Sequence, residues 1–155
     1  MMRPPFSVLM AAYPRFVDRA PLFADIGWTD LVNDKAYWDT CAIRMSYALL
    51  RAGVALPGAR MKANDGAIKG RYIEPGQARL SNILKKVWGQ PEVYVDKASA
   101  QMGIGHRTGV VSFFHIEGGN GGHIDLIWKA PGRMFQDCAR SCYFSAKTVW
   151  FWALV

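Results

Sequence analysis

Residues 39–53 read DTCAIRMSYALLRAG, and they predict the first long helix of the chain. Apolar residues recur in this stretch every three or four positions, which is the period of one helix face: Ala42, Met45, Leu49 and Ala52. Gly53 then ends the helix. Asp39 or Thr40 is suited to cap its first turn, because a side-chain oxygen accepts hydrogen bonds from the free amides there. Cys41 is therefore predicted at the helix start.

Cys41 stands where a cysteine gains reactivity. The unpaired amides and the dipole of a helix N-terminus favour an anion, so they favour the thiolate over the thiol. The thiolate is the nucleophilic form, and an enzyme that uses it needs a nearby base, usually a histidine. The alternative interpretation of Cys41 is a buried structural thiol.

Three histidines are candidates for that base. His123 opens the strand-like segment HIDLIW directly after a glycine-rich turn, and the end of a strand brings a side chain to the lip of a sheet. His115 lies inside an apolar strand-like segment, where a core histidine is the simpler interpretation. His106 lies in a loop, where a solvated histidine is expected. His123 is therefore the favoured base.

A carboxylate bonded to the second ring nitrogen would orient the imidazole. Asp125 and Asp137 are the candidates. Strand alternation puts Asp125 on the same face as His123, but we expect its side chain to run parallel to the histidine and to fall short of the ring. Asp137 comes from a later segment and is expected to approach from a neighbouring strand. We favour Asp137 as the third residue and keep Asp125 as the alternative.

The rest of the chain predicts one more helix and a sheet. Residues 77–88 carry an apolar stripe with helical spacing and end at a glycine, whereas 109–117, 123–128 and 146–155 are strand-like. The sequence GGNGG between the first two strands is predicted to be a turn. Helices followed by antiparallel strands indicate an α+β fold, and the length fits one domain over residues 1–155.

Two segments carry weaker signals. The first 35 residues hold several aromatics and prolines and are expected to wrap the core, with a short helix near 29–34. Residues 54–76 are expected to form a loop with one extended piece at RYIEP.

Cys138 and Cys142 form the motif CARSC, which allows a small disulfide loop if the backbone turns suitably there. Two free thiols are the alternative. The disulfide would leave Cys41 as the odd cysteine and would imply work in an oxidising compartment. One close cysteine pair lacks the further ligands of a zinc site, so we expect neither a metal nor a cofactor.

The composition points to an anionic partner. The formal net charge is +7 and the sequence pI is about 9.5, which suits nucleic acid, anionic lipid or bacterial cell wall. No nucleic-acid-binding motif is visible, so we expect no nucleic acid. No apolar run reaches the roughly 18 to 20 residues of a membrane span. The apolar part of MMRPPFSVLMAAYPRF is too brief for a cleavable signal peptide, so we expect synthesis in the cytoplasm without one.

Four motifs together resemble the fourth family of amidase effectors of type VI secretion: DTCAIRMSYALLRAG, GGHIDLIW, CARSC and VWFWAL. The similarity covers the chain from Ile26 to its end. The family consists of papain-like cysteine peptidases of the NlpC type. The resemblance therefore implies a papain-like α+β fold, with Cys41 as nucleophile and His123 as base. It implies cleavage of peptidoglycan stem peptides between D-glutamate and meso-diaminopimelate.

The same resemblance implies the partners and the place of action. The type VI secretion machinery would deliver the protein to the periplasm of Gram-negative target cells, and a cognate immunity protein would plug its site. The chain departs from the family pattern at Asp39, where asparagine is usual. Family members can also carry the catalytic aspartate inside the cysteine loop, whereas here Asp137 lies just outside it.

Two other functions are compatible with parts of the sequence. A non-catalytic module that binds cell wall or nucleic acid would use the basic charge and the six tryptophans, because aromatic side chains stack on sugars and bases. Another papain-like hydrolase or an acyltransferase would need the same cysteine and histidine, so only its products would separate it from the amidase.

Overall fold

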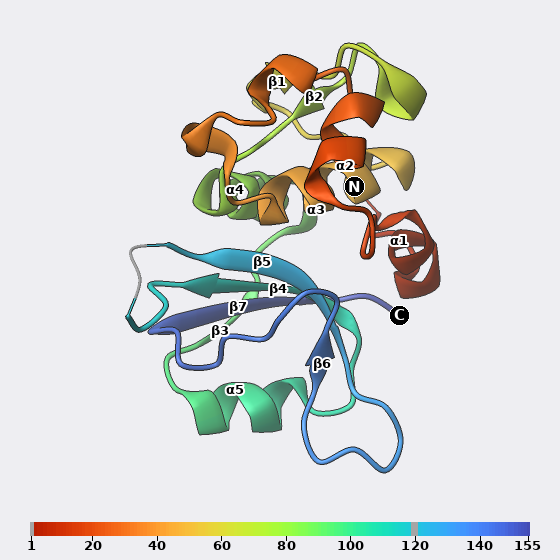
Figure 1. Ribbon diagram of the computed structural model, residues 1–155. Helices are drawn as coiled ribbons and strands as arrows, with labels where there is room; N and C mark the ends of the chain where they lie inside the picture. Colours follow the sequence, from red (N-terminus) through yellow and green to blue (C-terminus); the bar gives the residue numbers. More distant parts are fainter. Residues whose placement is uncertain (1, 119–120) are drawn as a thin grey trace.

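The computed structural model describes residues 2–118 and 121–155, and their elements form three layers (Figure 1). Helices α1 to α4 and a small two-stranded sheet lie on one side of a five-stranded antiparallel sheet, and α5 lies on the other side. The helices are α1 (Phe6–Ala12), α2 (Arg19–Asp25), α3 (Cys41–Arg51), α4 (Gln77–Trp88) and α5 (Lys97–Ile104), with 3-10 turns at η1 (Thr29–Leu31), η2 (Lys35–Tyr37) and η3 (Gly66–Ile68). The small sheet pairs β1 (Met61–Lys62) with β2 (Tyr72–Ile73).

The large sheet leaves the beginning of one strand accessible. Its order is β3-β7-β4-β5-β6, and the strands are β3 (Glu92–Tyr94), β4 (Gly109–Phe114), β5 (His123–Trp128), β6 (Asp137–Cys138) and β7 (Thr148–Ala153). The short β6 pairs with the far end of β5, where Trp128 lies opposite Asp137. The beginning of β5, at His123, pairs with β4 through Phe113. This end of β5 is therefore open on the β6 side, where a side chain from another element can reach it.

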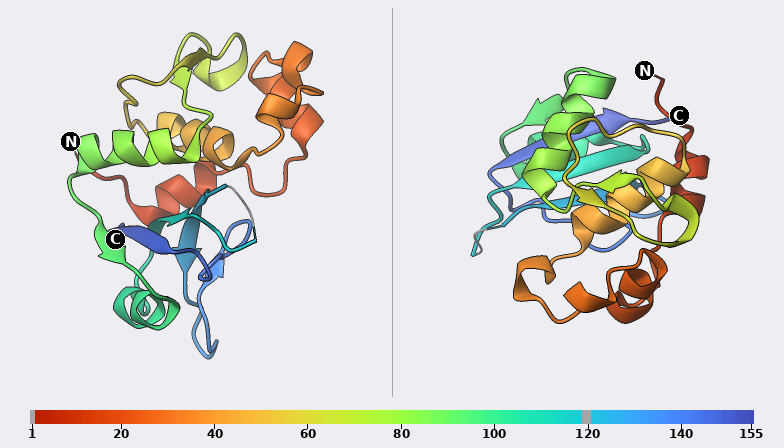
Figure 2. Two further views of the ribbon diagram at one scale, coloured as in Figure 1. Left: turned by 90° about the vertical axis from the view of Figure 1, so that its left-hand side faces the viewer. Right: turned by 90° about the horizontal axis from the view of Figure 1, so that it is seen from above.

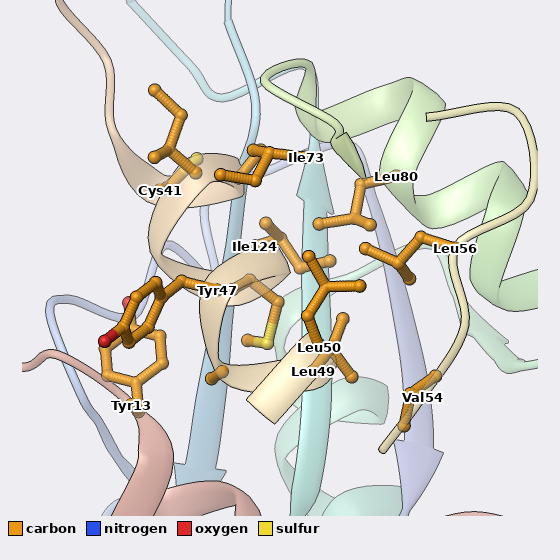
Figure 3. Packing of buried hydrophobic residues seen from close by; sticks show 14 of the residues in the cluster. Tyr13, Cys41, Tyr47, Leu49, Leu50, Val54, Leu56, Ile73, Leu80 and Ile124 are labelled. Carbon is orange, nitrogen blue, oxygen red and sulfur yellow. The ribbon is translucent and has the colours of Figure 1, made fainter. Parts of the chain in front are cut away.

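Helix α3 forms the centre of the helical layer. All its residues from Cys41 to Leu50 are buried, and the helix packs against α1, α4 and β5. Figure 3 shows Leu49 of α3, Leu80 of α4 and Ile124 of β5 in one apolar cluster. Burial of each such side chain stabilises the fold by roughly 1.5–3 kcal/mol. The start of α3 is therefore fixed relative to the start of β5 by an apolar core.

A buried arginine connects α3 to the N-terminal segment. Arg44 is 2% exposed, and its guanidinium donates to the backbone oxygens of Pro14 and Val17 at 2.7 and 2.6 Å. Its Nε also donates to the hydroxyl of Thr40 at 2.9 Å. These bonds compensate for the burial of the charge, and they hold the segment after α1 against the first turn of α3. The two chain ends also meet, because the Phe6 amide donates to the Val155 oxygen (Figure 2).

Several predicted elements are confirmed. The mixed α+β class is correct, and α4 and β5 have the predicted bounds. Helix α3 starts at Cys41 as expected and ends at Arg51, before Gly53 with its φ of 87°. The extended piece within 54–76 is β2.

Other predictions need correction. The first 35 residues contain α1 and α2 as well as the expected short turn η1, and neither β3 nor α5 was predicted. Strand β4 ends at Phe114 because His115 adopts a φ of 56°, which breaks the extended backbone. The predicted turn GGNGG lies partly outside the described residues, which exclude 119–120. Within the described part of the chain, no helix is both long and apolar enough to cross a membrane.

Candidate active site

The Cys41 thiol lies between the first turn of α3 and the start of β5. Its side chain is buried, and the groups that shift its pKa include the carboxylate of Asp39 and the backbone N–H groups of Ile124 and Ala42. Asp39 also accepts a hydrogen bond from the Cys41 backbone N–H, at 3.0 Å. Asp39 therefore caps the helix, whereas the Thr40 hydroxyl accepts from Arg44 instead.

The surroundings of Cys41 oppose the thiolate that a helix start favours. Burial raises the pKa of the Cys41 thiol far above its usual range, the charge of Asp39 raises it further, and the Ile124 amide lowers it. Burial and Asp39 thus act against the helix dipole, and the resting thiolate stays a prediction. Attack by this sulfur requires a base that removes the proton during the reaction.

His123 supplies an imidazole at the first position of β5. The ring stacks on Phe113 of the neighbouring strand, with centroids 6.3 Å apart and an interplanar angle of 12°. Tyr143 packs edge-on against it at 5.1 Å. Nε2 lies 2.7 Å from Oδ2 of Asp125. The two aromatic contacts and this bond fix the ring, and they leave Nδ1 as the nitrogen that can accept a proton.

Asp125 is fully buried and surrounded by hydrogen-bond donors. Its Oδ2 accepts from the backbone amides of Arg140 and Ser141 at 2.9 and 3.0 Å, in addition to its contact with His123. Its Oδ1 accepts from the Leu126 amide at 2.7 Å. Because a carboxylate only accepts hydrogen bonds, Nε2 of His123 must carry the proton in this pair. In the neutral imidazole this tautomer leaves the Nδ1 lone pair free, as a general base requires.

Asp137, the favoured third residue, lies elsewhere. It pairs with Trp128 at the far end of β5, and at about 3.3 Å per residue this is on the order of 16 Å along the strand from His123. The preference is therefore corrected to Asp125. Side chains two residues apart on one strand start only about 7 Å apart, so an imidazole and a carboxylate that lean together can meet. The sequence argument underestimated this lean.

The cysteine loop contributes through its backbone. Cys138 and Cys142 are joined by a disulfide, with Cα atoms 5.3 Å apart. The loop between them carries the amides of Arg140 and Ser141 that bond Asp125. No side-chain signal in CARSC indicated this role, because the bonds come from main-chain groups.

The other two histidines are placed away from this site. His115 is exposed and follows the end of β4, so the interpretation as a core histidine is wrong. His106 is exposed, as expected for a loop residue, and lies after α5. Neither contributes to the hollows that surround His123.

Two hollows meet the surface at these residues. One has a volume of about 420 Å³ and the other about 390 Å³. Four residues border both hollows: Trp38, Asp39, His123 and Tyr143. Cys41, Arg140 and Ser141 border the first, and Gly121 and Gly122 border the second. The fold thus presents a thiol, an imidazole and a charged rim to one accessible region, in the manner of a cysteine-type hydrolase.

Comparisons with known proteins agree with this class. Residues 37–152 match the model of a family described as "Type VI secretion system (T6SS), amidase effector protein 4". The comparison with curated proteins gave no match. Among solved structures, the effector Tae4 from Enterobacter cloacae is similar at 22% identity and a TM-score of 0.75, over 99% of this chain and 98% of that chain.

Two effector–immunity structures are similar as well. The Tae4–Tai4 complex from Enterobacter cloacae contains a chain with 22% identity and a TM-score of 0.73, and the Tae4/Tai4 system from Salmonella typhimurium contains one with 20% identity and a TM-score of 0.75. Each match covers 99% of this chain and 100% of the other. At this identity they show a shared fold.

The family match spans most of the chain, and the chain therefore belongs to the type VI secretion amidase effector protein 4 family. It is an enzyme, a cysteine-type hydrolase, and acts as an antibacterial peptidoglycan amidase delivered into target cells by type VI secretion.

Proposed function

We propose that Cys41, His123 and Asp125 are the catalytic residues of a papain-like, NlpC-type peptidase, and that the bond cleaved joins D-glutamate to meso-diaminopimelate in peptidoglycan stem peptides. The observation that carries the proposal is the buried His123–Asp125 pair, 2.7 Å apart, beside the same hollow as the thiol. The single domain responsible spans residues 1–155.

The first half of the reaction forms an acyl-enzyme. Nδ1 of His123 takes the proton from the Cys41 sulfur, and the sulfur electron pair forms a bond with the scissile carbonyl carbon. In this proposal the Cys41 backbone N–H donates to the oxyanion that develops. Protonated His123 then gives its proton to the departing amine of diaminopimelate, and the carbon–nitrogen bond breaks.

The second half releases the product. His123 removes a proton from a water molecule, which attacks the thioester carbon, and the thiol leaves with that proton. Throughout, Asp125 holds the imidazole in the tautomer with the proton on Nε2, and it stabilises the imidazolium that forms in each half. Neither step needs a cofactor.

The proposal includes a place of action and a partner. The peptidoglycan target and the disulfide fit the periplasm of a Gram-negative target cell, which is oxidising. A cognate immunity protein in the producing strain would cover the hollows at Cys41, and the presence of Tai4 with the similar Tae4 chains supports such a partner. The net charge of +7 would concentrate the enzyme on the anionic cell wall.

The test is mass spectrometry of muropeptides after incubation with purified Gram-negative sacculi. We expect fragments cut between D-glutamate and diaminopimelate with the wild type, and none with Cys41→Ala or His123→Ala. His106→Ala is the matched control, because His106 is exposed and distant from the hollows, and it should cut normally. A folded Cys41→Ala protein that still cuts would exclude the mechanism. Intact muropeptides with every protein, including the wild type, would favour a cell-wall-binding module.

A further inference from the structure

Asp39 takes no part in the proposed reaction, yet its side chain binds a backbone group that the reaction uses. Its Oδ1 accepts the Cys41 backbone N–H at 3.0 Å, and this N–H is the proposed donor to the oxyanion. The substrate carbonyl oxygen and the Asp39 carboxylate therefore compete for one hydrogen. The Asp39 side chain is exposed and borders both hollows, so it can swing away without disturbing the core.

Asp39 also acts on the sulfur through its charge. Because its carboxylate bonds the backbone N–H of Cys41, it sets a negative charge near the thiol, which raises the pKa of that thiol and opposes the loss of its proton. A carboxylate at this point thus acts against the helix dipole, which favours the thiolate. An uncharged residue at position 39 would leave the dipole unopposed.

The charged and titratable groups around this pair come from several elements. His123 of β5 faces Asp39 across both hollows, and Tyr143 and Arg140 border the same region. Tyr13 after α1 is close enough to Cys41 for the charge of the sulfur to raise the pKa of the Tyr13 phenol, and Arg44 of α3 acts on Tyr13 in turn. Asp125 lies behind His123. Asp39 is the carboxylate that contacts Cys41 directly.

We propose that Asp39 is a positioning residue that holds the resting enzyme in an inactive arrangement: its carboxylate occupies the Cys41 backbone N–H and sets a negative charge beside the nucleophile until the substrate carbonyl displaces it. This inference rests on the proposed role of Cys41 as nucleophile. When the carbonyl oxygen takes over the N–H, the carboxylate moves away from the sulfur. This single movement of the Asp39 side chain frees the Cys41 N–H for the oxyanion. It also removes a negative charge from the neighbourhood of the thiol, which makes proton transfer from the thiol to His123 easier.

The experiment is a pH titration of the thiol, followed through its alkylation by iodoacetamide. Cys138 and Cys142 are in a disulfide, so Cys41 is the free cysteine that reacts. Asp39→Asn removes the charge but keeps an oxygen that can accept the Cys41 N–H. Asp39→Ala removes both. Asp34→Asn is the matched control, because Asp34 accepts an amide two residues ahead, that of Ala36, in the same way and borders neither hollow.

We expect the midpoint of alkylation to fall by at least about one pH unit in Asp39→Asn and Asp39→Ala, which is a tenfold rise in the thiolate fraction below the midpoint. Asp34→Asn should titrate like the wild type. The midpoint is the informative quantity, because a thiolate of lower pKa is also intrinsically less nucleophilic and its limiting rate falls. An unchanged or higher midpoint in Asp39→Asn would overturn the electrostatic part of the proposal.

Turnover tests the second part. On a purified muropeptide at one common pH, kcat/KM should be higher for Asp39→Ala than for Asp39→Asn, because both variants lack the charge and only the alanine leaves the Cys41 N–H free. Equal or lower values for Asp39→Ala would overturn the competition for the N–H. The titration needs no substrate, so its failure is separate from a failure of the proposed function, which would appear as full activity of Cys41→Ala.

Discussion

Replacing Asp125 with asparagine tests whether the buried carboxylate orients His123. Oδ2 of Asp125 receives three donors, from His123, Arg140 and Ser141, and Oδ1 receives the Leu126 amide. Asparagine has a single accepting oxygen. If the asparagine oxygen takes the position of Oδ2, its NH2 group takes the position of Oδ1 and faces the Leu126 N–H, which is also a donor. The hydrogen bond from the Leu126 amide to a charged group is then lost. We expect the free energy of unfolding to fall by about 1.5–3 kcal/mol. For a chain of this length, that lowers Tm by about 3 to 12 °C.

The effect on turnover should be much larger than the effect on stability. If the amide turns its NH2 toward the imidazole, Nε2 must become an acceptor and the ring proton moves to Nδ1. The base is then blocked at the nitrogen that serves Cys41. The asparagine also cannot stabilise the imidazolium. We expect kcat to fall by about 10²- to 10⁴-fold. KM should change little, because Asp125 borders neither hollow.

The assay is steady-state cleavage of a purified disaccharide muropeptide, with kcat and KM determined separately and thermal melting as the fold control. Asp137→Asn is the matched control, since Asp137 lies at the far end of the same strand pair and should retain wild-type kcat. Wild-type kcat in Asp125→Asn would refute the reasoning, as would an equal loss of kcat in both variants.

Three further results are expected. Reduction of the Cys138–Cys142 disulfide should lower the free energy of unfolding by about 2 kcal/mol. It should also lower kcat, because the loop amides that bond the Asp125 carboxylate become less well held. Thermal melting and turnover, each with and without dithiothreitol, measure the two effects. Arg44→Met should lower the free energy of unfolding in urea by about 3 kcal/mol, because it leaves the buried Pro14 oxygen and the part-buried Val17 oxygen without this donor. Binding to sacculi, measured by co-sedimentation, should weaken as the salt concentration rises from roughly 50 to roughly 500 mM, because added ions screen the charges of the protein and the cell wall. Binding that does not change with salt would count against the role of the net charge.

The elements that could be read from the sequence are those whose pattern is local. Helix α4 has an apolar stripe and a terminal Gly89 with a φ of 88°, and β5 alternates between two faces, so their bounds were predicted correctly. Helices α1 and α2 have seven residues each and lack acidic residues in their first turns. Their helical state depends on packing, of α1 against α3 and of α2 against η1, which a local pattern does not reveal.

The candidate site divides in the same way. Cys41 and His123 were identified because each stands at the start of an element, which is a local signal. The choice between Asp125 and Asp137 depended on whether the side chains of Asp125 and His123 tilt toward each other, and on where the cysteine loop passes β5. Main-chain amides of Arg140 and Ser141 decide that choice, and they lie 15 and 16 positions from Asp125 in the chain. No spacing rule reports a contact of that kind.

Two physical effects on the charge of Cys41 oppose each other at this helix start. A helix dipole is worth about 0.3–1 kcal/mol to a nearby charge at an exposed terminus, and at most about 2 kcal/mol when partly buried. Removing a charged group from water costs several kcal/mol. Cys41 is 5% exposed, so desolvation outweighs the dipole, and Asp39 adds to it. A buried neutral thiol cannot attack until its proton is removed. The rate therefore depends on an imidazole that is already in the right tautomer and orientation, which is what Asp125, Phe113 and Tyr143 provide.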